Sequence, residues 1–194
     1  MGKTNAINSH ECADLGLSVK WATCNVGASR PEESGDFYAW GETETKPIYN
    51  GDNCGTREKG PDDISGTSLD AARVKWRAPW RMPTVAEFEE LRAKCTWTWK
   101  TNNGTGGYEV TSKKNGNSIF LPAAGRRTGT TLHDAGDGGF YWCSSPHGYT
   151  FSACYLRFFS DRRSTIMSRN EDERARGMPL RPVCGNKTSR FRLF

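Results

Sequence analysis

The residue types best suited to contacting a partner lie in one short segment near the carboxyl end, Ala153–Ser160 (ACYLRFFS). Successive side chains of a strand point to opposite faces, so the segment divides into two sets. One set is apolar throughout: Cys154, Leu156 and Phe158. The other mixes a phenol, a guanidinium and a benzene ring: Ala153, Tyr155, Arg157 and Phe159. The first set predicts a core face, and the second is unusual for a plain solvent face.

Two interpretations of the second set remain open from the pattern alone. Tyr and Arg each offer a large, stiff contact area with a polar end, which is typical of binding surfaces. On that interpretation the strand keeps one face constant and presents the other to a partner, and Phe158 is buried while Tyr155, Arg157 and Phe159 are exposed. Alternatively, the segment is an amphipathic edge strand with a second layer packed over it.

Catalytic and metal-binding patterns are not evident. The three histidines, His10, His133 and His147, have no neighbours at metal-ligand spacing. The seven cysteines are an odd number without a C-x-x-C pair, and Cys24, Cys95 and Cys154 lie in apolar surroundings that favour a core role. No Gly-x-Ser-x-Gly elbow is present. We therefore expect no enzyme activity, no metal and no cofactor.

The charge pattern gives little support for a nucleic-acid partner. The net charge is only +5, and part of it lies in the tail Asn186–Phe194, which has three basic residues and no acid. Arg162 and Arg163 are close to Asp161, whereas nucleic-acid binding requires a clustered basic face. No apolar run is long enough to cross a bilayer, and the first twenty residues lack a secretory segment. We expect either a chain released by another route or a trimmed form of an exported protein.

Helix signals occur twice. Thr84 and Glu87 form a capping box that predicts a helix over Val85–Lys94, with Glu87, Glu89 and Glu90 on its solvated face. A shorter helix is predicted over Leu69–Lys75, capped by Ser68 or Thr67.

Turn residues are dense elsewhere and predict short strands and ordered loops. The Gly-rich Asn102–Gly107 (NNGTGG) predicts a hairpin turn, Ile119–Pro122 a buried strand, and Thr43–Pro61 a surface loop. We expect one α+β domain of two helices and short, mostly antiparallel strands, with the ends of the domain close together.

Several motifs in fixed order resemble a known family. They are Asp14–Ala28 (DLGLSVKWATCNVGA), Gly35–Glu42 (GDFYAWGE), Asp63–Ala72 (DISGTSLDAA), Trp80–Glu87 (WRMPTVAE), Ser118–Arg126 (SIFLPAAGR), Tyr141–Pro146 (YWCSSP) and Leu180–Val183 (LRPV). Together they resemble the major paralogous domain abundant in Fibrobacter and Bacteroides-type bacteria, which has a C-type lectin fold of the formylglycine-generating-enzyme subtype. The resemblance implies an N-terminal extension over residues 1–11, a C-type lectin-like domain over 12–184 and a basic tail over 185–194.

The same resemblance implies that residues 139–183 are a variable segment. Members of this fold serve as variable proteins of diversity-generating retroelements, in which adenine mutagenesis turns asparagine codons into almost any NNC or NNT codon. The present chain keeps the family's constant residues Trp142, Ser144, Ser145, Pro146, Ala153, Leu156, Phe158 and Ser160. The candidate ligand-binding residues are Phe140, His147, Tyr149, Thr150, Phe151, Tyr155, Arg157, Phe159, Asp161, Arg162 and Arg163. We expect them to converge into one exposed patch.

The function implied is non-enzymatic binding of a protein or cell-surface ligand, at the cell surface or on a phage particle. One alternative is an undiversified surface or adhesion module of the same family, and another is a formylglycine-generating-type oxidase. The chain departs from the family at Cys143, where Ser is usual. It also lacks the Glu-Pro-Asn and Trp-Asn-Asp triplets of calcium-dependent sugar binding.

Overall fold

The computed structural model describes residues 4–57, 62–148, 151–160 and 167–185. The helices in this part of the chain are α1 (Ala71–Trp76), α2 (Val85–Lys94) and a short 3-10 helix, η1 (Gly51–Asn53). The strands are β1 (Thr4–Ile7), β2 (His10–Ala13), β3 (Lys20–Ala22), β4 (Trp80–Arg81), β5 (Cys95–Asn102), β6 (Thr105–Ser112), β7 (Ser118–Pro122), β8 (Arg126–Thr128), β9 (Thr131–His133), β10 (Gly138–Pro146), β11 (Ser152–Phe159), β12 (Met167–Glu173) and β13 (Val183–Cys184).

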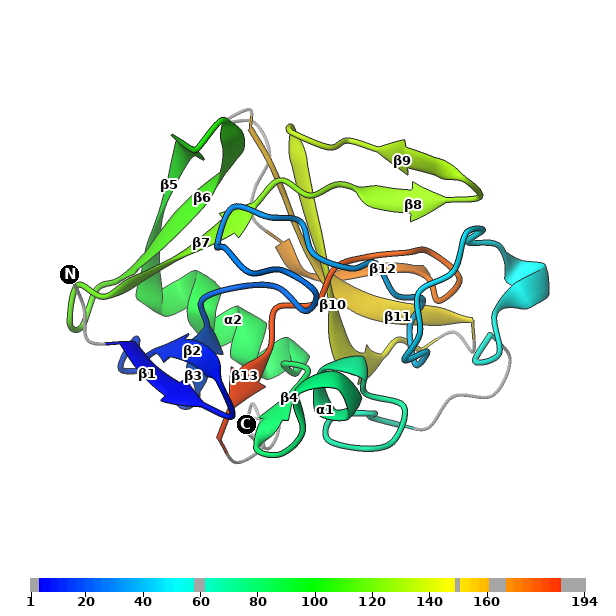
Figure 1. The fold of residues 1–194 in the computed structure, drawn as a ribbon, viewed down its shortest axis with the longest axis horizontal. Coiled ribbons are helices and arrows are strands. Elements are labelled where there is room, and N and C mark those ends of the chain that lie inside the picture. The colour runs from blue at the N-terminus through cyan, green and yellow to red at the C-terminus, as the bar shows by residue number, and fades with distance from the viewer. Residues whose placement is uncertain (1–3, 58–61, 149–150, 161–166, 186–194) are drawn as a thin grey trace.

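These strands form four sheets (Figure 1). The orders are β1-β2-β3-β13-β4, β10-β11-β12, β5-β6-β7 and β8-β9. All pairings between named strands in the described residues are antiparallel. The expected α+β class with two α-helices is therefore confirmed.

The beginning and the end of the described chain meet in the five-stranded sheet. Val183 of β13 pairs with Trp21 of β3 on one side and with Arg81 of β4 on the other. In Figure 1 the blue strands β1 to β3 accordingly lie beside the red strand β13. The expectation that the ends of the domain lie close together is confirmed.

Helix α2 has the predicted bounds, Val85–Lys94, and begins at its capping box. The Thr84 side chain accepts a hydrogen bond from the Glu87 backbone N–H, and the Glu87 carboxylate accepts one from the Thr84 N–H at 2.8 Å. The expectation of a solvated Glu87 is wrong, because this side chain is fully buried and pairs with Arg81 at 2.6 Å. Helix α1 is capped by Asp70 rather than by Ser68 or Thr67, since the Asp70 carboxylate accepts from the Arg73 N–H.

Local signals were also accurate for the β5–β6 hairpin and for β7. The two-residue turn Asn103-Gly104 has positive φ at both positions, 45° and 85°, which matches the primed turns that favour Asn-Gly. The predicted strand Ile119–Pro122 is β7 with one residue more. The loop over residues 43–57 is less superficial than expected, because the Tyr49 and Thr56 side chains are buried.

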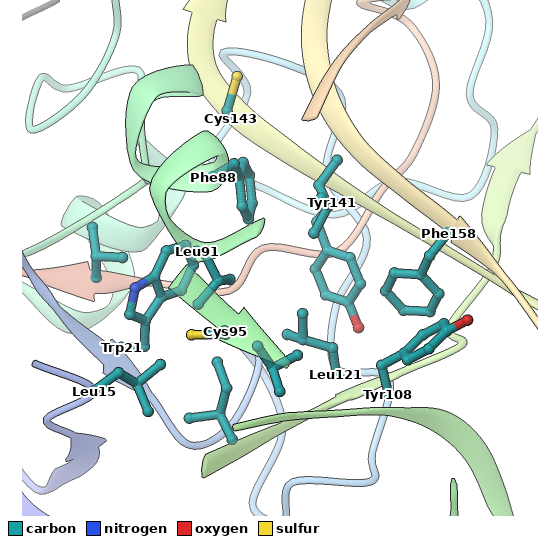
Figure 2. Packing of buried hydrophobic residues seen from close by; sticks show 14 of the residues in the cluster. Leu15, Trp21, Phe88, Leu91, Cys95, Tyr108, Leu121, Tyr141, Cys143 and Phe158 are labelled. Carbon is teal, nitrogen blue, oxygen red and sulfur yellow. The ribbon is translucent and has the colours of Figure 1, made fainter. Parts of the chain in front are cut away.

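Strands β10 and β11 carry buried apolar side chains on both faces of their sheet. The first core lies on one face, against α2 and the sheet β5-β6-β7 (Figure 2). Its buried members include Leu15, Trp21, Phe88, Leu91, Cys95, Tyr108, Leu121, Tyr141, Cys143, Cys154, Leu156 and Phe158. The second core lies on the other face, against α1 and residues 38–40 and 178–180. Its members include Tyr38, Trp40, Trp76, Trp80, Phe140, Trp142, Ala153, Tyr155, Met178 and Leu180.

Candidate functional site

The first face of β11 is a core face, as the alternation predicted. Leu156 and Phe158 are fully buried in the first core. The Phe158 ring lies 5.2 Å from that of Tyr108 and 6.0 Å from that of Tyr141, measured between centroids. This face holds the strand against the rest of the first core (Figure 2).

On the second face of this sheet, the prediction of exposure is wrong for two candidate ligand-binding residues, Tyr155 of β11 and Phe140 of β10. Tyr155 is only 3% exposed and Phe140 only 1% exposed, so neither is available to a partner. Their rings stack on each other at 6.0 Å, and Trp142 meets Tyr155 edge-on at 5.9 Å. The second layer that the sequence left open as an alternative is present, although β11 is a central strand and not an edge.

Two indole hydrogen bonds attach residues 38–40 of this layer to β10. The Trp142 N–H donates to the Tyr38 carbonyl at 3.0 Å. The Trp40 N–H donates to the Cys143 carbonyl at 2.9 Å. Residues 38–40 are thereby attached to β10 across more than a hundred positions of sequence, and Tyr38 and Trp40 lie in the same buried cluster as Tyr155.

The far end of β11 is more open. Arg157 and Phe159 are both partly exposed, and the Arg157 guanidinium carbon lies 5.9 Å from the Phe159 ring centroid. Arg126 of β8 lies over the ring of Phe140, with its guanidinium carbon 4.7 Å from the ring centroid. Arg126 also pairs with Asp134, since its Nε lies 3.8 Å from the Asp134 carboxylate. Arg126 was not among the predicted site residues, because no local pattern places β8 over Phe140.

The hairpin end of β10 and β11 carries two further candidates. Phe151 is 47% exposed, and His147 is half-buried. Behind them the buried Arg174 side chain donates to the Ser152 carbonyl at 3.2 Å and to the Thr56 carbonyl at 3.0 Å. Arg174 thus attaches the start of β11 to the loop over residues 43–57, a role that its sequence neighbours do not signal.

The described candidates lie at two ends of β11 and not in one patch. Phe151 comes directly before β11 and Phe159 ends it, and a strand of this length spans about 23 Å. Tyr155 lies between them and is buried. The expectation of a single patch is therefore wrong for these residues. The other candidates lie outside the described residues: Tyr149, Thr150, Asp161, Arg162 and Arg163.

Two thiols lie at the base of the hairpin. Cys143 is fully buried and Cys154 is 7% exposed. The Cys143 S–H donates to the Cys154 carbonyl at 3.1 Å. Burial raises the pKa of the Cys143 thiol, and the neighbouring Cys154 thiol raises it further.

Other chemistry-bearing groups of the described chain lie apart from this region. A hollow of about 360 Å³ is lined by residues 41–46 with Ser68 and Leu69, where Lys46 and Glu42 pair at 2.8 Å. No group of three or more His, Cys, Asp or Glu side chains in the described residues is arranged to hold a metal ion. Among these residues we find no helix with the length and apolar character needed to cross a membrane.

Comparisons with protein-family models, with curated proteins and with solved structures gave no match for this chain.

Proposed function

We propose that this protein is a non-enzymatic ligand-binding protein with a C-type lectin-like fold, whose carboxyl-terminal segment is diversified by a retroelement. The ligand is a protein or cell-surface molecule, and the protein acts at a cell surface or on a phage particle. The proposal rests on the resemblance described above and on how burial is distributed between constant and replaceable positions.

That distribution is the observation that carries the proposal. Five residues that the chain shares with the family pattern are fully buried: Trp142, Ser144, Ala153, Leu156 and Phe158. The other three are half-buried: Ser145, Pro146 and Ser160. Among the described candidates, four reach the surface to some degree: His147, Phe151, Arg157 and Phe159. A segment whose core positions stay constant while its surface positions change keeps its fold through many rounds of replacement.

The surface we assign to the ligand is therefore smaller than the alternation first suggested. Phe140 and Tyr155 are excluded because their side chains are buried. The remaining contacts come from the hairpin end, with His147 and Phe151, and from the far end, with Arg157 and Phe159. Exposed aromatic and guanidinium groups of this kind are enriched at binding hot spots.

Two matched libraries test the proposal. The first uses NNC and NNT codons at His147, Phe151, Arg157 and Phe159. The second uses the same codons at four buried positions of the same segment: Trp142, Ala153, Leu156 and Phe158. With both displayed on cells and treated with protease, most members of the first should remain folded and most members of the second should be cut. Equal losses in the two libraries would show that the surface positions are not replaceable.

The DNA around the gene separates diversification from the alternative of an undiversified adhesion module. A diversified segment has a near-copy of its coding sequence that differs mainly at adenines, next to a reverse transcriptase gene. If that copy is missing while the first library remains folded, diversification is rejected. The proposal of an undiversified binding module is then retained.

A further inference from the structure

Two cysteines lie side by side at the base of the hairpin that carries His147 and Phe151. Trp142 of β10 and Tyr155 of β11 form the last regular pair before the register shifts. Cys143 follows Trp142, and Cys154 precedes Tyr155, so both cysteines lie where the register shift begins. Both belong to the first core, which means that their side chains lie on the same face of the sheet.

The placement of this pair is compatible with a disulfide. Disulfides bridge Cα separations of roughly 4.4–6.8 Å, and adjacent antiparallel strands lie within that range. The Cys143 sulfur lies 3.1 Å from the Cys154 carbonyl oxygen, and the Cys154 sulfur lies 3.6 Å from the Pro146 carbonyl oxygen. Joining the two sulfurs requires rotation of both side chains away from these carbonyls.

We propose that Cys143 and Cys154 form a disulfide when the protein meets a disulfide oxidant, and that this bond covalently closes the base of the hairpin over residues 144–153. The reaction is thiol–disulfide exchange. The first thiolate attacks oxidised glutathione and releases one glutathione thiol. The second thiolate then attacks the mixed disulfide and releases another. Two protein thiols are oxidised, and one glutathione disulfide is reduced to two thiols.

Burial sets the order and the timing of the two steps. Cys154 is the more accessible thiol, so it receives the oxidant first, and Cys143 resolves the mixed disulfide. Since burial raises the pKa of the Cys143 thiol, its thiolate is scarce in the folded protein at neutral pH. The bond therefore forms most readily while the chain is folding, and more slowly in the folded protein.

The bond does not depend on the proposed function. If the hairpin is also diversified, the disulfide holds its base in place whatever side chains its exposed positions carry. Cys143 is the position at which the chain departs from the Ser usual in the family, and this departure supplies the second thiol.

Mass spectrometry of the full chain tests the bond directly. No Lys or Arg lies between Arg127 and Arg157, so trypsin releases both cysteines in one peptide over residues 128–157 that holds no other cysteine. After refolding in a mixture of oxidised and reduced glutathione and blocking of remaining thiols, we expect this peptide to be lighter by two hydrogens and unmodified. In denaturant the same mixture should leave a smaller share of this peptide in the bridged form, because the unfolded chain does not hold the two thiols together.

Variants connect the bond to stability. Oxidised protein should melt several degrees higher than reduced protein, since closing the loop restricts the unfolded chain. Cys143→Ser and Cys154→Ser should each abolish this difference. Cys95→Ser is the matched control and should retain the difference. Cys95 is a thiol of the same core, but it lies outside the pair and has Lys113 and Glu90 as its charged neighbours. Two variants at the pair keep the test usable if one of them fails to fold.

Three results would overturn the proposal. After refolding at every glutathione ratio, both thiols could still be blocked once the protein is denatured. Another pair, such as Cys12 with Cys184, could take up the oxidation instead. The rise in melting temperature could also survive in Cys143→Ser and Cys154→Ser. None of these results would bear on whether the exposed positions of the hairpin tolerate replacement.

Discussion

Tyr155 and Arg157 are separated by one residue on the same face of β11 and have different environments. The Tyr155 ring lies within 6.0 Å of the rings of Phe140 and Trp142 and is buried. Arg157 lies nearer the end of the strand, where its side chain is partly exposed. The residue types alone suggested one role for both, and the neighbouring layer assigns them different ones.

This difference predicts unequal costs of replacement. Tyr155→Ser should lower the free energy of unfolding by about 3–5 kcal/mol, because it leaves a cavity in the second core. Arg157→Ser should change it by only about 0.5 kcal/mol, as is usual for surface positions. Urea denaturation of the two variants measures both values. Equal losses would mean that residues 38–40 do not close over Tyr155 as described.

At the scale of elements, α2 and β4 are joined by a buried ion pair. The Arg81 guanidinium meets both oxygens of the Glu87 carboxylate, at 2.9 Å and 2.6 Å. The same carboxylate caps the helix through the Thr84 N–H. A single side chain therefore begins the helix and holds it to the five-stranded sheet.

Removing the charge of Glu87 should be costly. Glu87→Gln leaves the guanidinium of Arg81 buried without a carboxylate, and we expect a loss of about 3–5 kcal/mol in the free energy of unfolding. The matched control is Lys94→Gln, which breaks the exposed pair with Glu90 in the same helix and should cost about 0.3–0.5 kcal/mol. Chemical denaturation followed by circular dichroism gives both losses in the free energy of unfolding. A loss for Glu87→Gln as small as that for Lys94→Gln would contradict the buried pairing.

The β1–β2 hairpin packs on α1 through His10, whose imidazole stacks on Trp76 at 3.7 Å between ring centroids. Partial burial lowers the pKa of His10 below its ordinary 6.5. The fold therefore favours the neutral ring, and the stability it contributes is present above pH 6.5 and is lost as pH falls through the lowered pKa.

This sign predicts a pH-dependent contribution from the hairpin. Between pH 7 and pH 5 the melting temperature of the wild type should fall relative to that of His10→Phe, which keeps an aromatic ring without a titrating group. His133→Gln, on the exposed strand β9, should follow the wild type. If the melting temperatures of the wild type and His10→Phe fell equally with pH, the His10 imidazole would not contribute to the pH dependence of stability.

On the scale of the whole molecule, the two cores share one central sheet. β10 contributes Tyr141 to the first core and Trp142 to the second, and β11 contributes Phe158 and Tyr155 in the same way. Neither core can lose its packing without exposing the strands that hold the other. We therefore expect the described region to unfold in one cooperative transition.

Variants in the two cores should affect the same transition. Phe158→Ala and Trp142→Ala should each destabilise by about 3–5 kcal/mol. In both variants tryptophan fluorescence and far-ultraviolet circular dichroism should report a single midpoint, since tryptophans are present in both cores. Two separated midpoints in either variant would show that the cores are independent.

Features that depend on near neighbours in the chain follow from the sequence alone. The Thr84–Glu87 box set the start of α2, Asn103-Gly104 set the turn between β5 and β6, and alternation identified the buried side of β11. Capping hydrogen bonds, positive φ and strand pleat all act within a few residues, so they are visible in a short window of sequence.

Which side chains of the second face reach solvent depends on elements that are distant in the sequence. Tyr155 is buried in one cluster with Tyr38 and Trp40, Phe140 lies beneath Arg126, and Cys143 meets Cys154 across two strands. Each of these contacts depends on where another element comes to lie, and the first joins segments more than a hundred residues apart. An alternating strand with aromatic residues on both faces fits a binding surface or a doubly covered central strand equally well, and the second core is what separates the two.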